Sequence, residues 1–482
     1  MKLSELLKGL NPLQIHADAD MDISYVTSDS RKVTPGSLFV AVTGFAADGN
    51  RFIPMAMEKG AAVVVTTKVP QLDVPYVLVD NDRYALATIG ANYYGRPADD
   101  LVMIGVTGTN GKTSTTWLLK QVIQKVKQTR VGLVGTMENH IGDLVLPTER
   151  TTPESIELQE LFAQMRSAGC KYAVMEVSSH SLVLDRVAGI HFAVAAFTNL
   201  TEDHLDFHKT MEDYCDAKAI LFSRCDKAVV NADDAWAQRI TQNCRADVLT
   251  TSSKGAGKLM AENVRLNADS VAFTAVYGDQ RVKISVPIPG KFTVYNVLSV
   301  LGIALQLGIS LEEAAAVLRD VAGVKGRVEV VPTPGKDYTV LIDYAHTPDG
   351  LENVLSSVRG FCKGRLIAVF GCGGDRDPIK RPIMGGIGVK IADLAVITSD
   401  NPRTEDPNAI LADIVKGVGE AKNYTVIENR PSAIRYAMDI AQKDDIIVLA
   451  GKGHETYQEI MGVKHHLDER EVVAAYLQEK GN

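Results

Sequence analysis

A glycine-rich stretch with one lysine, Val106-Thr-Gly-Thr-Asn-Gly-Lys-Thr-Ser114, has the residue types and spacing of a phosphate-binding loop. An apolar run precedes it and apolar residues at helical spacing follow it, so we predict a strand, a glycine turn and a helix. In such a turn the backbone N–H groups and the helix start face a phosphate, Lys112 can neutralise phosphate oxygens, and the Thr113 hydroxyl can hold Mg²⁺. The expected ligand is ATP or GTP, and the residues expected to bind it are Gly108, Thr109, Asn110, Gly111, Lys112, Thr113 and Ser114.

The spacing of this loop departs from the strict pattern G-x-x-x-x-G-K-T, which requires glycine where the chain has Val106. The alternative is an ordinary glycine turn that contains a lysine by chance. The strand pattern before the loop and the helix pattern after it favour phosphate binding.

Polar side chains follow three further strand-like segments of the central region. Because ligands of open α/β sheets bind beyond the carboxyl ends of the strands, these side chains should lie at the same edge as Lys112. The metal of a triphosphate needs carboxylate or imidazole ligands, for which Glu176 and His204 are the candidates. A single carboxylate at a strand end is more often a helix cap, but three polar ends favour a site. The three polar segments are Glu176–His180, Asn199–His208 and Asn231–Asp234.

The two ends of the chain also alternate between strands, polar loops and helices. From about residue 326, strand-like runs end at Asp343, Gly371, Ser399 and Gly451, which indicates a doubly wound, mostly parallel sheet. We therefore predict an α/β fold with three domains. They are a small α/β domain at 1–97, a central phosphate-loop domain with a parallel sheet at 98–325, and a Rossmann-like C-terminal domain at 326–482.

Composition and charge exclude several classes of protein. The 482 residues carry a net charge of −8 and no basic block, which disfavours a nucleic-acid-binding protein. No apolar stretch reaches the roughly 18 residues that span a bilayer, and the N-terminus lacks a signal-peptide core, so we expect a cytoplasmic protein. The six cysteines form no C-x-x-C pair and are expected to be buried thiols in a reducing compartment.

Five motifs of the chain, in order and at the usual separations, resemble those of the ATP-dependent Mur ligases of peptidoglycan precursor synthesis. The resemblance covers essentially the whole chain. The five are Gly108–Thr113, Glu176–His180, Asn199–His204, Gly326-Arg327 and Asp343–His346. Three more, Thr151–Pro153, Asp400–Arg403 and Gly451–Glu455, resemble the branch that adds meso-diaminopimelate to UDP-MurNAc-L-Ala-D-Glu.

The resemblance implies a monomeric enzyme that joins these two substrates through an acyl phosphate, with ATP and two Mg²⁺ ions as cofactors. Asn296, Arg327 and Asp343 would join the phosphate loop in binding ATP, although Asn296 could also cap a helix. The UDP-sugar peptide would contact Ser28, Ser30, Phe45, Ala46, Ala47, Thr151, Thr152, Ser178 and Arg186. The amino acid would contact Arg376, Asp400, Asn401, Pro402, Arg403, Gly451 and Glu455.

The resemblance also assigns catalytic and metal-binding roles. Lys112, Lys218 and His204 would be catalytic, and Thr113, Glu176, His204 and Lys218 would hold the metal, with Lys218 as a carbamate. A free ammonium, with a pKa near 10.4, would repel Mg²⁺, whereas a carbamate resembles a carboxylate. The alternative is an unmodified surface lysine.

Two positions depart from the family pattern, and other functions stay open. Leu184 lies where glutamine is common and Thr293 where asparagine is common, so neither receives a polar role. Arg403 and Arg376 are expected to bind the extra carboxylate of diaminopimelate, or else to pair with Asp375 and Glu405. The alternatives are an L-lysine-adding ligase, a folate polyglutamate ligase and a nucleotide-gated binding protein without ligation chemistry.

Overall fold

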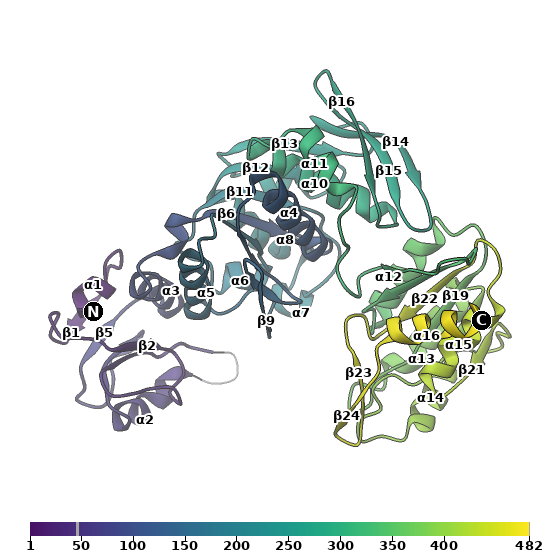
Figure 1. Cartoon of the computed structure of the whole chain (residues 1–482). Helices are drawn as coiled ribbons and strands as arrows, with labels where there is room; N and C mark the ends of the chain where they lie inside the picture. The colour runs from purple at the N-terminus through teal and green to yellow at the C-terminus, as the bar shows by residue number, and fades with distance from the viewer. Residues whose placement is uncertain (45–47, 482) are drawn as a thin grey trace. The chain divides into compact units, whose positions relative to one another are not determined.

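The computed structural model describes residues 1–44 and 48–481 (Figure 1). The chain divides into two compact units. Unit 1 comprises Met1–Leu259 and Ser299–Ser310, and unit 2 comprises Met260–Leu298 and Leu311–Asn482. Each unit combines parallel strands with helices, as the α/β prediction requires. The domain boundaries at 97/98 and 325/326 stay a prediction.

The N-terminal part of unit 1 is a five-stranded sheet in the order β1-β5-β4-β3-β2. Its strands β2 to β5 are parallel, and β1 pairs antiparallel with β5. Helix α2 ends at Glu58, and Gly60 two residues further on has a φ of +93° that other residues rarely adopt. The elements are α1 (Leu3–Leu6), β1 (Gln14–His16), β2 (Tyr25–Thr27), β3 (Ser37–Val40), η1 (Gly49–Phe52), α2 (Ile53–Glu58), β4 (Ala61–Thr66), β5 (Tyr76–Leu78) and α3 (Asp82–Tyr93).

The rest of unit 1 is built on a sheet in the order β13-β12-β11-β6-β10-β7-β8-β9. Its central strands are buried on both faces and are accordingly continuous apolar runs. The elements are η2 (Pro97–Asp100), β6 (Val102–Thr107), α4 (Lys112–Lys127), β7 (Val131–Val134), β8 (Asn139–Ile141), β9 (Leu144–Leu146), α5 (Ser155–Ser167), β10 (Tyr172–Glu176), α6 (Ser179–Val183), β11 (Phe192–Phe197), α7 (Leu205–His208), α8 (Met211–Ala219), η3 (Ile220–Ser223), β12 (Cys225–Asn231), α9 (Ala237–Thr241) and β13 (Asp247–Ser252).

Strand register explains why the predicted polar segments meet. The phosphate-loop strand β6 lies between β10 and β11, and all three are parallel. Glu176 is paired with Val106, and Phe197 is paired with Thr107. The carboxyl ends of the three strands are therefore level, and each delivers its polar loop to the start of α4.

Unit 2 contains a six-stranded sheet in the order β17-β18-β22-β19-β20-β21, which is parallel except for β17. Strands β15 and β16 form an antiparallel hairpin whose turn is at Gly278-Asp279. The elements are β14 (Leu259–Leu266), β15 (Val271–Tyr277), β16 (Gln280–Val286), α10 (Lys291–Gln306), α11 (Leu311–Leu318), β17 (Glu329–Val331), β18 (Thr339–Asp343), α12 (Pro348–Arg359), β19 (Leu366–Phe370), α13 (Lys380–Ile391), β20 (Leu394–Ile397), α14 (Pro407–Val415), β21 (Tyr424–Val426), α15 (Arg430–Ile440), β22 (Ile446–Ala450), β23 (Tyr457–Ile460), β24 (Val463–His466) and α16 (Glu469–Gly481).

Helices cover both faces of the six-stranded sheet, which confirms the doubly wound prediction (Figure 1). Apolar residues of α12, α13 and α14 form one core cluster with the sheet, and those of α15 and α16 form another. Alternate residues of β19 belong to the two clusters, with Ala368 in one and Val369 in the other. The period of two residues in a strand accounts for this alternation.

Two expectations from composition can be compared with the structure. Among the described residues, no helix is long and apolar enough to cross a bilayer. All six cysteines are free thiols, but Cys225, Cys244 and Cys362 are only partly buried. The expectation that all six are buried is therefore wrong for these three.

Candidate active site

The phosphate loop of unit 1 depends on two glycines. Gly108 has a φ of +146°, and a Cβ there would lie 1.9 Å from the Thr198 hydroxyl oxygen. Gly111, with a φ of +86°, immediately precedes α4. These values place the loop in backbone conformations that favour glycine, which is the physical reason for the pattern seen in the sequence.

The loop is held by the segment that follows β11. The Thr109 amide donates to the Asn199 carbonyl at 2.8 Å, and the Asn110 amide donates to Asn199 Oδ1 at 3.0 Å. The Thr198 hydroxyl donates to the Asn110 carbonyl at 2.6 Å. Asn199 thus fixes the loop through both its main chain and its side chain, a role that sequence reasoning did not assign to it.

Two lysines meet at a single carbonyl oxygen of the loop. Lys112 Nζ donates to the Gly108 carbonyl at 2.8 Å, and Lys218 Nζ donates to the same oxygen at 3.0 Å. Lys218 is 1% exposed, so the alternative of a surface lysine is wrong. Burial, together with the charge of Lys112, lowers the pKa of Lys218 well below its ordinary value. A buried amine of this kind is neutral more readily than a surface lysine is.

Glu176 contacts a threonine of the phosphate loop, and three groups fix its carboxylate. Its Oε2 accepts from the Thr113 hydroxyl at 3.0 Å and lies 3.1 Å from the Thr136 hydroxyl. Its Oε1 accepts from the Thr136 amide at 2.9 Å, and a Cβ at Gly135 would lie 2.6 Å from that oxygen. Glu176 is therefore held against the side chain of Thr113, and Thr136 is a partner that the sequence did not reveal.

The oxygen atoms of Thr113 and Glu176 are a candidate cation site. Carboxylate and hydroxyl oxygens at this spacing are the ligand types that Mg²⁺ prefers. In residues 1–44 and 48–481, no three His, Cys, Asp or Glu side chains gather into a group that could hold a metal ion. Glu176 and Thr113 fit Mg²⁺, provided that further oxygens come from other groups.

His204 lies at the start of α7 and is largely exposed. Its ring centroid is 6.1 Å from that of Tyr214, and Lys218 Nζ lies 4.4 Å from the same Tyr214 ring. The Tyr214 hydroxyl in turn lies 3.2 Å from the Thr109 hydroxyl. Tyr214 is thus the residue around which the structure gathers His204, Lys218 and the phosphate loop.

The residues predicted to hold the UDP-sugar peptide in the central sheet lie together beside Glu176. The Thr152 hydroxyl donates to the Glu176 carbonyl at 2.8 Å and accepts from the Ser178 amide at 3.2 Å. Arg186 donates to the Thr152 carbonyl at 3.1 Å. Thr151 is joined to the same group, because its hydroxyl lies 3.0 Å from that of Thr136.

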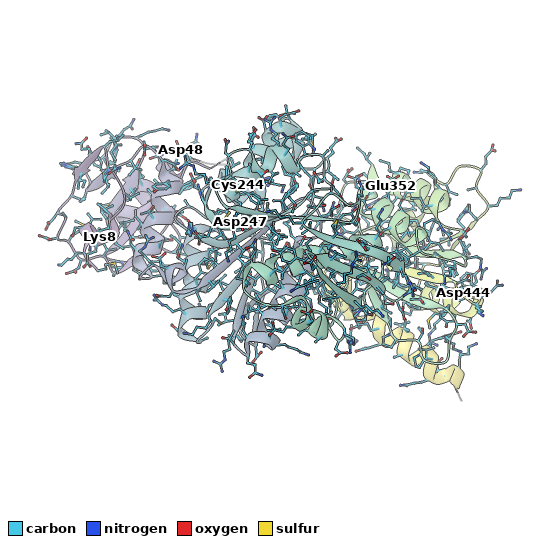
Figure 2. All side chains as sticks on the ribbon, turned by 90° about the horizontal axis from the view of Figure 1, so that it is seen from above. Lys8, Asp48, Cys244, Asp247, Glu352 and Asp444 are labelled. Atoms are coloured by element: carbon cyan, nitrogen blue, oxygen red, sulfur yellow. The ribbon has the colours of Figure 1, made fainter. Side chains whose placement is uncertain are left out.

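The residues predicted to bind the uridine end lie in the N-terminal sheet of unit 1. Ser28 and Ser30 follow β2 in a turn, with Ser28 exposed and Ser30 buried. Phe45, Ala46 and Ala47 lie outside the described residues. Asp48, labelled in Figure 2, follows them and pairs with Lys68 at 2.8 Å.

In unit 2, two of the predicted nucleotide-binding residues are neighbours. Asp343 ends β18 and accepts from the backbone amides of Val328 at 2.8 Å and Ala345 at 2.9 Å. Burial raises the pKa of the Asp343 carboxyl, and the charge of Arg327 opposes this rise. Asn296 is buried inside α10, so the alternative that it caps that helix is wrong.

Thr293, the position that departs from the family pattern, also lies in α10. Its hydroxyl donates to the Pro289 carbonyl at 2.8 Å. The hydroxyl is thus bonded to the main chain just before the helix, and the absence of a polar ligand role for Thr293 stays a prediction.

The predicted amino-acid-binding arginines flank one glycine of unit 2. A Cβ at Gly373 would lie 2.9 Å from Arg403 Nη1 and 4.0 Å from Arg376 Cγ. Arg403 donates to the Gly374 carbonyl at 2.7 Å, and its Nε lies 3.4 Å from Glu459 Oε2. The alternative that these arginines pair with Asp375 and Glu405 is wrong. Glu405 pairs with Arg381, and Arg376 donates to the main-chain carbonyl of Asp375 rather than to its carboxylate.

The other predicted amino-acid-binding residues converge on the same loops. A Cβ at Gly451 would lie 2.6 Å from Asp400 Oδ2, so only glycine allows the close approach of the two segments. Asn401 Nδ2 donates to Glu455 Oε2 at 2.9 Å. Pro402 lies between Asn401 and Arg403, and a Cβ at Gly374 would lie 2.0 Å from the Pro402 carbonyl oxygen.

Sequence reasoning missed two charged residues beneath these loops. Lys452 is fully buried and donates to Asn401 Oδ1 at 3.0 Å. Arg430 is also fully buried and donates to Glu469 Oε1 at 2.8 Å. For Lys452, the only signal in the sequence was its place inside the motif Gly451–Glu455. Arg430 belongs to none of the motifs found in the sequence.

Three family models match the chain. The model "Mur ligase family, catalytic domain" matches residues 22–94, "Mur ligase middle domain" matches 106–304, and "Mur ligase, glutamate ligase domain" matches 326–453. The phosphate loop, Glu176 and Lys218 lie in the second match, and Arg327 and Arg403 lie in the third.

Individual relatives match over the whole length. The UDP-N-acetylmuramoyl-L-alanyl-D-glutamate–2,6-diaminopimelate ligase 1 of Clostridium acetobutylicum is 48% identical over 99% of this chain and 100% of its own. The corresponding ligase of Clostridium tetani is 47% identical over the same shares. A solved structure of a UDP-N-acetylmuramoyl-L-alanyl-D-glutamate–2,6-diaminopimelate ligase has a TM-score of 0.78 at 32% identity, covering 100% of this chain and 99% of that one. MurF from Acinetobacter baumannii, at 17% identity and a TM-score of 0.60, covers 99% of this chain and 98% of its own and shares the fold.

Proposed function

The chain belongs to the Mur ligase family, and from this premise we propose that it is an ATP-dependent ligase that joins meso-diaminopimelate to UDP-MurNAc-L-Ala-D-Glu. One observation carries the proposal. Lys112 and Lys218 donate to the Gly108 carbonyl, while Thr152 donates to the main chain of Glu176, whose carboxylate accepts from Thr113. A phosphate loop, a carboxylate and a predicted substrate loop are thus parts of one hydrogen-bonded group.

In the proposed reaction the γ-phosphoryl group of ATP moves to the D-glutamyl carboxylate, and ADP leaves. The amine of the incoming amino acid attacks the acyl phosphate and loses a proton, and the tetrahedral intermediate expels phosphate as the amide forms. Lys112 would stabilise the negative charge that gathers on the transferred phosphoryl oxygens. This role needs the ammonium beside the loop, where its bonds to Gly108 and Thr109 hold it.

Two Mg²⁺ ions would supply charge neutralisation for the triphosphate when bound. Thr113, Glu176 and His204 would hold them together with Lys218 as a carbamate. Formation of that carbamate joins the neutral amine of Lys218 to CO₂ and releases a proton. The burial of Lys218, which disfavours its ammonium, supports this modification.

The nucleotide-binding expectation extends to unit 2, where Asn296, Arg327 and Asp343 would contact ATP. Ser28, Ser30 and the segment 45–47 would contact the uridine end of the substrate. The division of labour follows the proposed domains, with 1–97 for the UDP-sugar, 98–325 for ATP and 326–482 for the amino acid. Location in the cytoplasm and a monomeric state stay predictions.

Arg403 and Arg376 would bind the second carboxylate of meso-diaminopimelate, because a guanidinium is shaped for bidentate binding of carboxylate. Their approach to the same glycine, Gly373, supports this role. Glu455 would accept from the ammonium of the same amino acid. L-Lysine lacks the second carboxylate and would leave a partly buried arginine unpaired, so discrimination of about a hundredfold or more is expected.

The test measures phosphate release by the purified protein with ATP and UDP-MurNAc-L-Ala-D-Glu, with and without an amino acid. We expect sustained phosphate release that requires both the sugar dipeptide and meso-diaminopimelate. Mass spectrometry should detect the tripeptide product. Equal kcat/KM for L-lysine would replace the proposed specificity with that of a lysine-adding ligase. ATP binding without ligated product would replace the ligase with a nucleotide-gated binding protein.

A further inference from the structure

Lys452 is a fully buried lysine whose ammonium contacts two residues predicted to bind the amino acid. Its Nζ donates to Asn401 Oδ1 at 3.0 Å and to Glu455 Oε2 at 3.1 Å. It also lies 5.6 Å from the centroid of the Tyr457 ring. A lysine is rarely buried completely unless its charge is paired, so this ammonium belongs to a specific polar network.

The two carboxylate oxygens of Glu455 differ in their hydrogen bonds. Oε2 accepts from both Lys452 and Asn401 Nδ2, the latter at 2.9 Å. Within the part of the chain that the structure describes, Oε1 has no hydrogen-bond partner. The Glu455 side chain is 16% exposed, so this second oxygen belongs to a carboxylate that is still accessible from solvent. One oxygen is thus committed to the protein and the other remains available to a ligand.

The same network fixes the opposite side of the predicted amino-acid site. Asn401 Oδ1 accepts both from Lys452 and from the backbone amide of Glu459 at 3.0 Å. Glu459 in turn lies beside Arg403, with a distance of 3.4 Å between its Oε2 and the Arg403 Nε. Lys452 therefore contacts the carboxylate on one side directly and reaches the arginine on the other side through two residues.

We infer that Lys452 is a positioning residue for amino-acid selection: it turns one oxygen of Glu455 toward the ligand and fixes Asn401 between Glu455 and Arg403. The inference rests on the proposed function and adds to it a network that links the acceptor Glu455 to the guanidinium of Arg403. An acceptor and a guanidinium held in one network suit a ligand carrying an ammonium and a carboxylate on one carbon, as the distal centre of a diamino dicarboxylic acid does. A ligand with an ammonium alone would use only Glu455.

The experiment compares Lys452→Met with Lys464→Met in steady-state assays of the full chain. Lys464 is a matched control because it is exposed on β24 and lies 4.2 Å from the centroid of the same Tyr457 ring, but outside the network. Loss of a hydrogen bond to a charged group predicts a rise of about 10- to 100-fold in the KM for meso-diaminopimelate in Lys452→Met. The KM values for ATP and the sugar dipeptide should stay within about twofold, and Lys464→Met should match the unaltered protein.

A second readout separates positioning from a loss of structure. The preference for meso-diaminopimelate over L-lysine, measured as the ratio of kcat/KM values, should fall by about tenfold in Lys452→Met. Lys452→Arg, which keeps a cation in the network, should fold even if Lys452→Met does not and should retain more of the preference than a neutral residue would. The inference would be overturned if a folded Lys452→Met variant kept both its KM for meso-diaminopimelate and its preference. It would also be overturned if Lys452→Arg folded and kept the preference although a crystal structure showed the hydrogen bonds of the network to be broken.

The failure of the inference can be distinguished from failure of the proposed function. If the unaltered protein shows no turnover with meso-diaminopimelate, the proposed function is wrong and the role of Lys452 falls with it. If the unaltered protein turns over this substrate and the folded Lys452→Met variant matches it, only the role of Lys452 is wrong.

Discussion

Replacing Arg430 with methionine should lower the free energy of unfolding of unit 2 by about 3–5 kcal/mol. Arg430 is fully buried at the start of α15 and donates to Glu469 Oε1 and to the Ala450 carbonyl, each at 2.8 Å. Its Nη1 also lies 3.9 Å from Asp400 Oδ2. Methionine fills most of the same volume, so the main cost is the buried carboxylate of Glu469 left without its partner.

The magnitude follows from the burial of both partners. Exposed ion pairs contribute about 1 kcal/mol or less, but removing one member of a buried pair strands a charge in a poorly solvated site. Both the Arg430 and Glu469 side chains are at most 1% exposed, so solvent cannot compensate. For a body of 150–250 residues, the loss corresponds to a fall of roughly 6–20 °C in the melting temperature.

Differential scanning calorimetry on the full chain measures this loss, with Arg435→Met as the control. Arg435 lies on the same helix, pairs with Glu479 at the surface, and should cost less than about 1 kcal/mol. The double variant Arg430→Met, Glu469→Leu should recover most of the loss, because it removes the unpaired charge. A loss below 1 kcal/mol in the single variant, or a double variant as unstable as the single one, would refute the reasoning.

Four further results are expected. Lys112→Ala should reduce turnover by about a thousandfold or more at an unchanged melting temperature, and near-normal turnover would contradict the phosphate-loop assignment. Carbon-13 NMR with labelled bicarbonate should show one carbamate signal that Lys218→Ala lacks, and full activity of that variant would disprove its role. Arg403→Ala should lose most of the preference for meso-diaminopimelate and retain ATP binding, as measured by kcat/KM ratios and calorimetric titration. Burial lowers the pKa of His140 below its ordinary 6.5, so the unfolded chain binds a proton there before the folded chain does, and stability should fall as the pH drops below about 6.5. The difference in melting temperature between pH 7.5 and pH 5.5 should shrink in His140→Gln but not in His191→Gln, whose imidazole is exposed.

The parts of the fold that could be predicted from the sequence are those set by local chain chemistry. Gly108 and Gly111 indicated the phosphate loop in the sequence, because the backbone angles at these positions exclude most other residues. Continuous apolar runs predicted parallel strands, and the rule that ligands bind beyond the carboxyl ends of such strands predicted that Glu176 lies beside the loop. That rule does not give the strand register, and only the structure shows that Glu176 on β10 is paired with Val106 on β6.

The parts that could not be predicted depend on contacts between distant segments. Lys452 and Asn401 are separated by 51 residues, and nothing in either motif indicates that one bonds to the other. Lys218 resembles a surface lysine on a short helix, and only tertiary packing buries it against Gly108. The alternative that Arg403 pairs with Asp375 or Glu405 is wrong for the same reason, because the carboxylate beside Arg403 is that of Glu459 on β23.

The main chain of Arg403 restricts how this position can change during evolution. Its amide donates to the Glu459 carbonyl at 3.0 Å, and its carbonyl accepts from the Met461 amide at 2.6 Å. Any residue except proline can make both bonds, so the side chain can be exchanged without rebuilding the hairpin. The φ of +51° nevertheless disfavours β-branched side chains, which are strained in this region. A change in amino-acid preference is therefore accessible through one codon, but its outcomes are restricted to unbranched or amide side chains such as lysine, glutamine and asparagine.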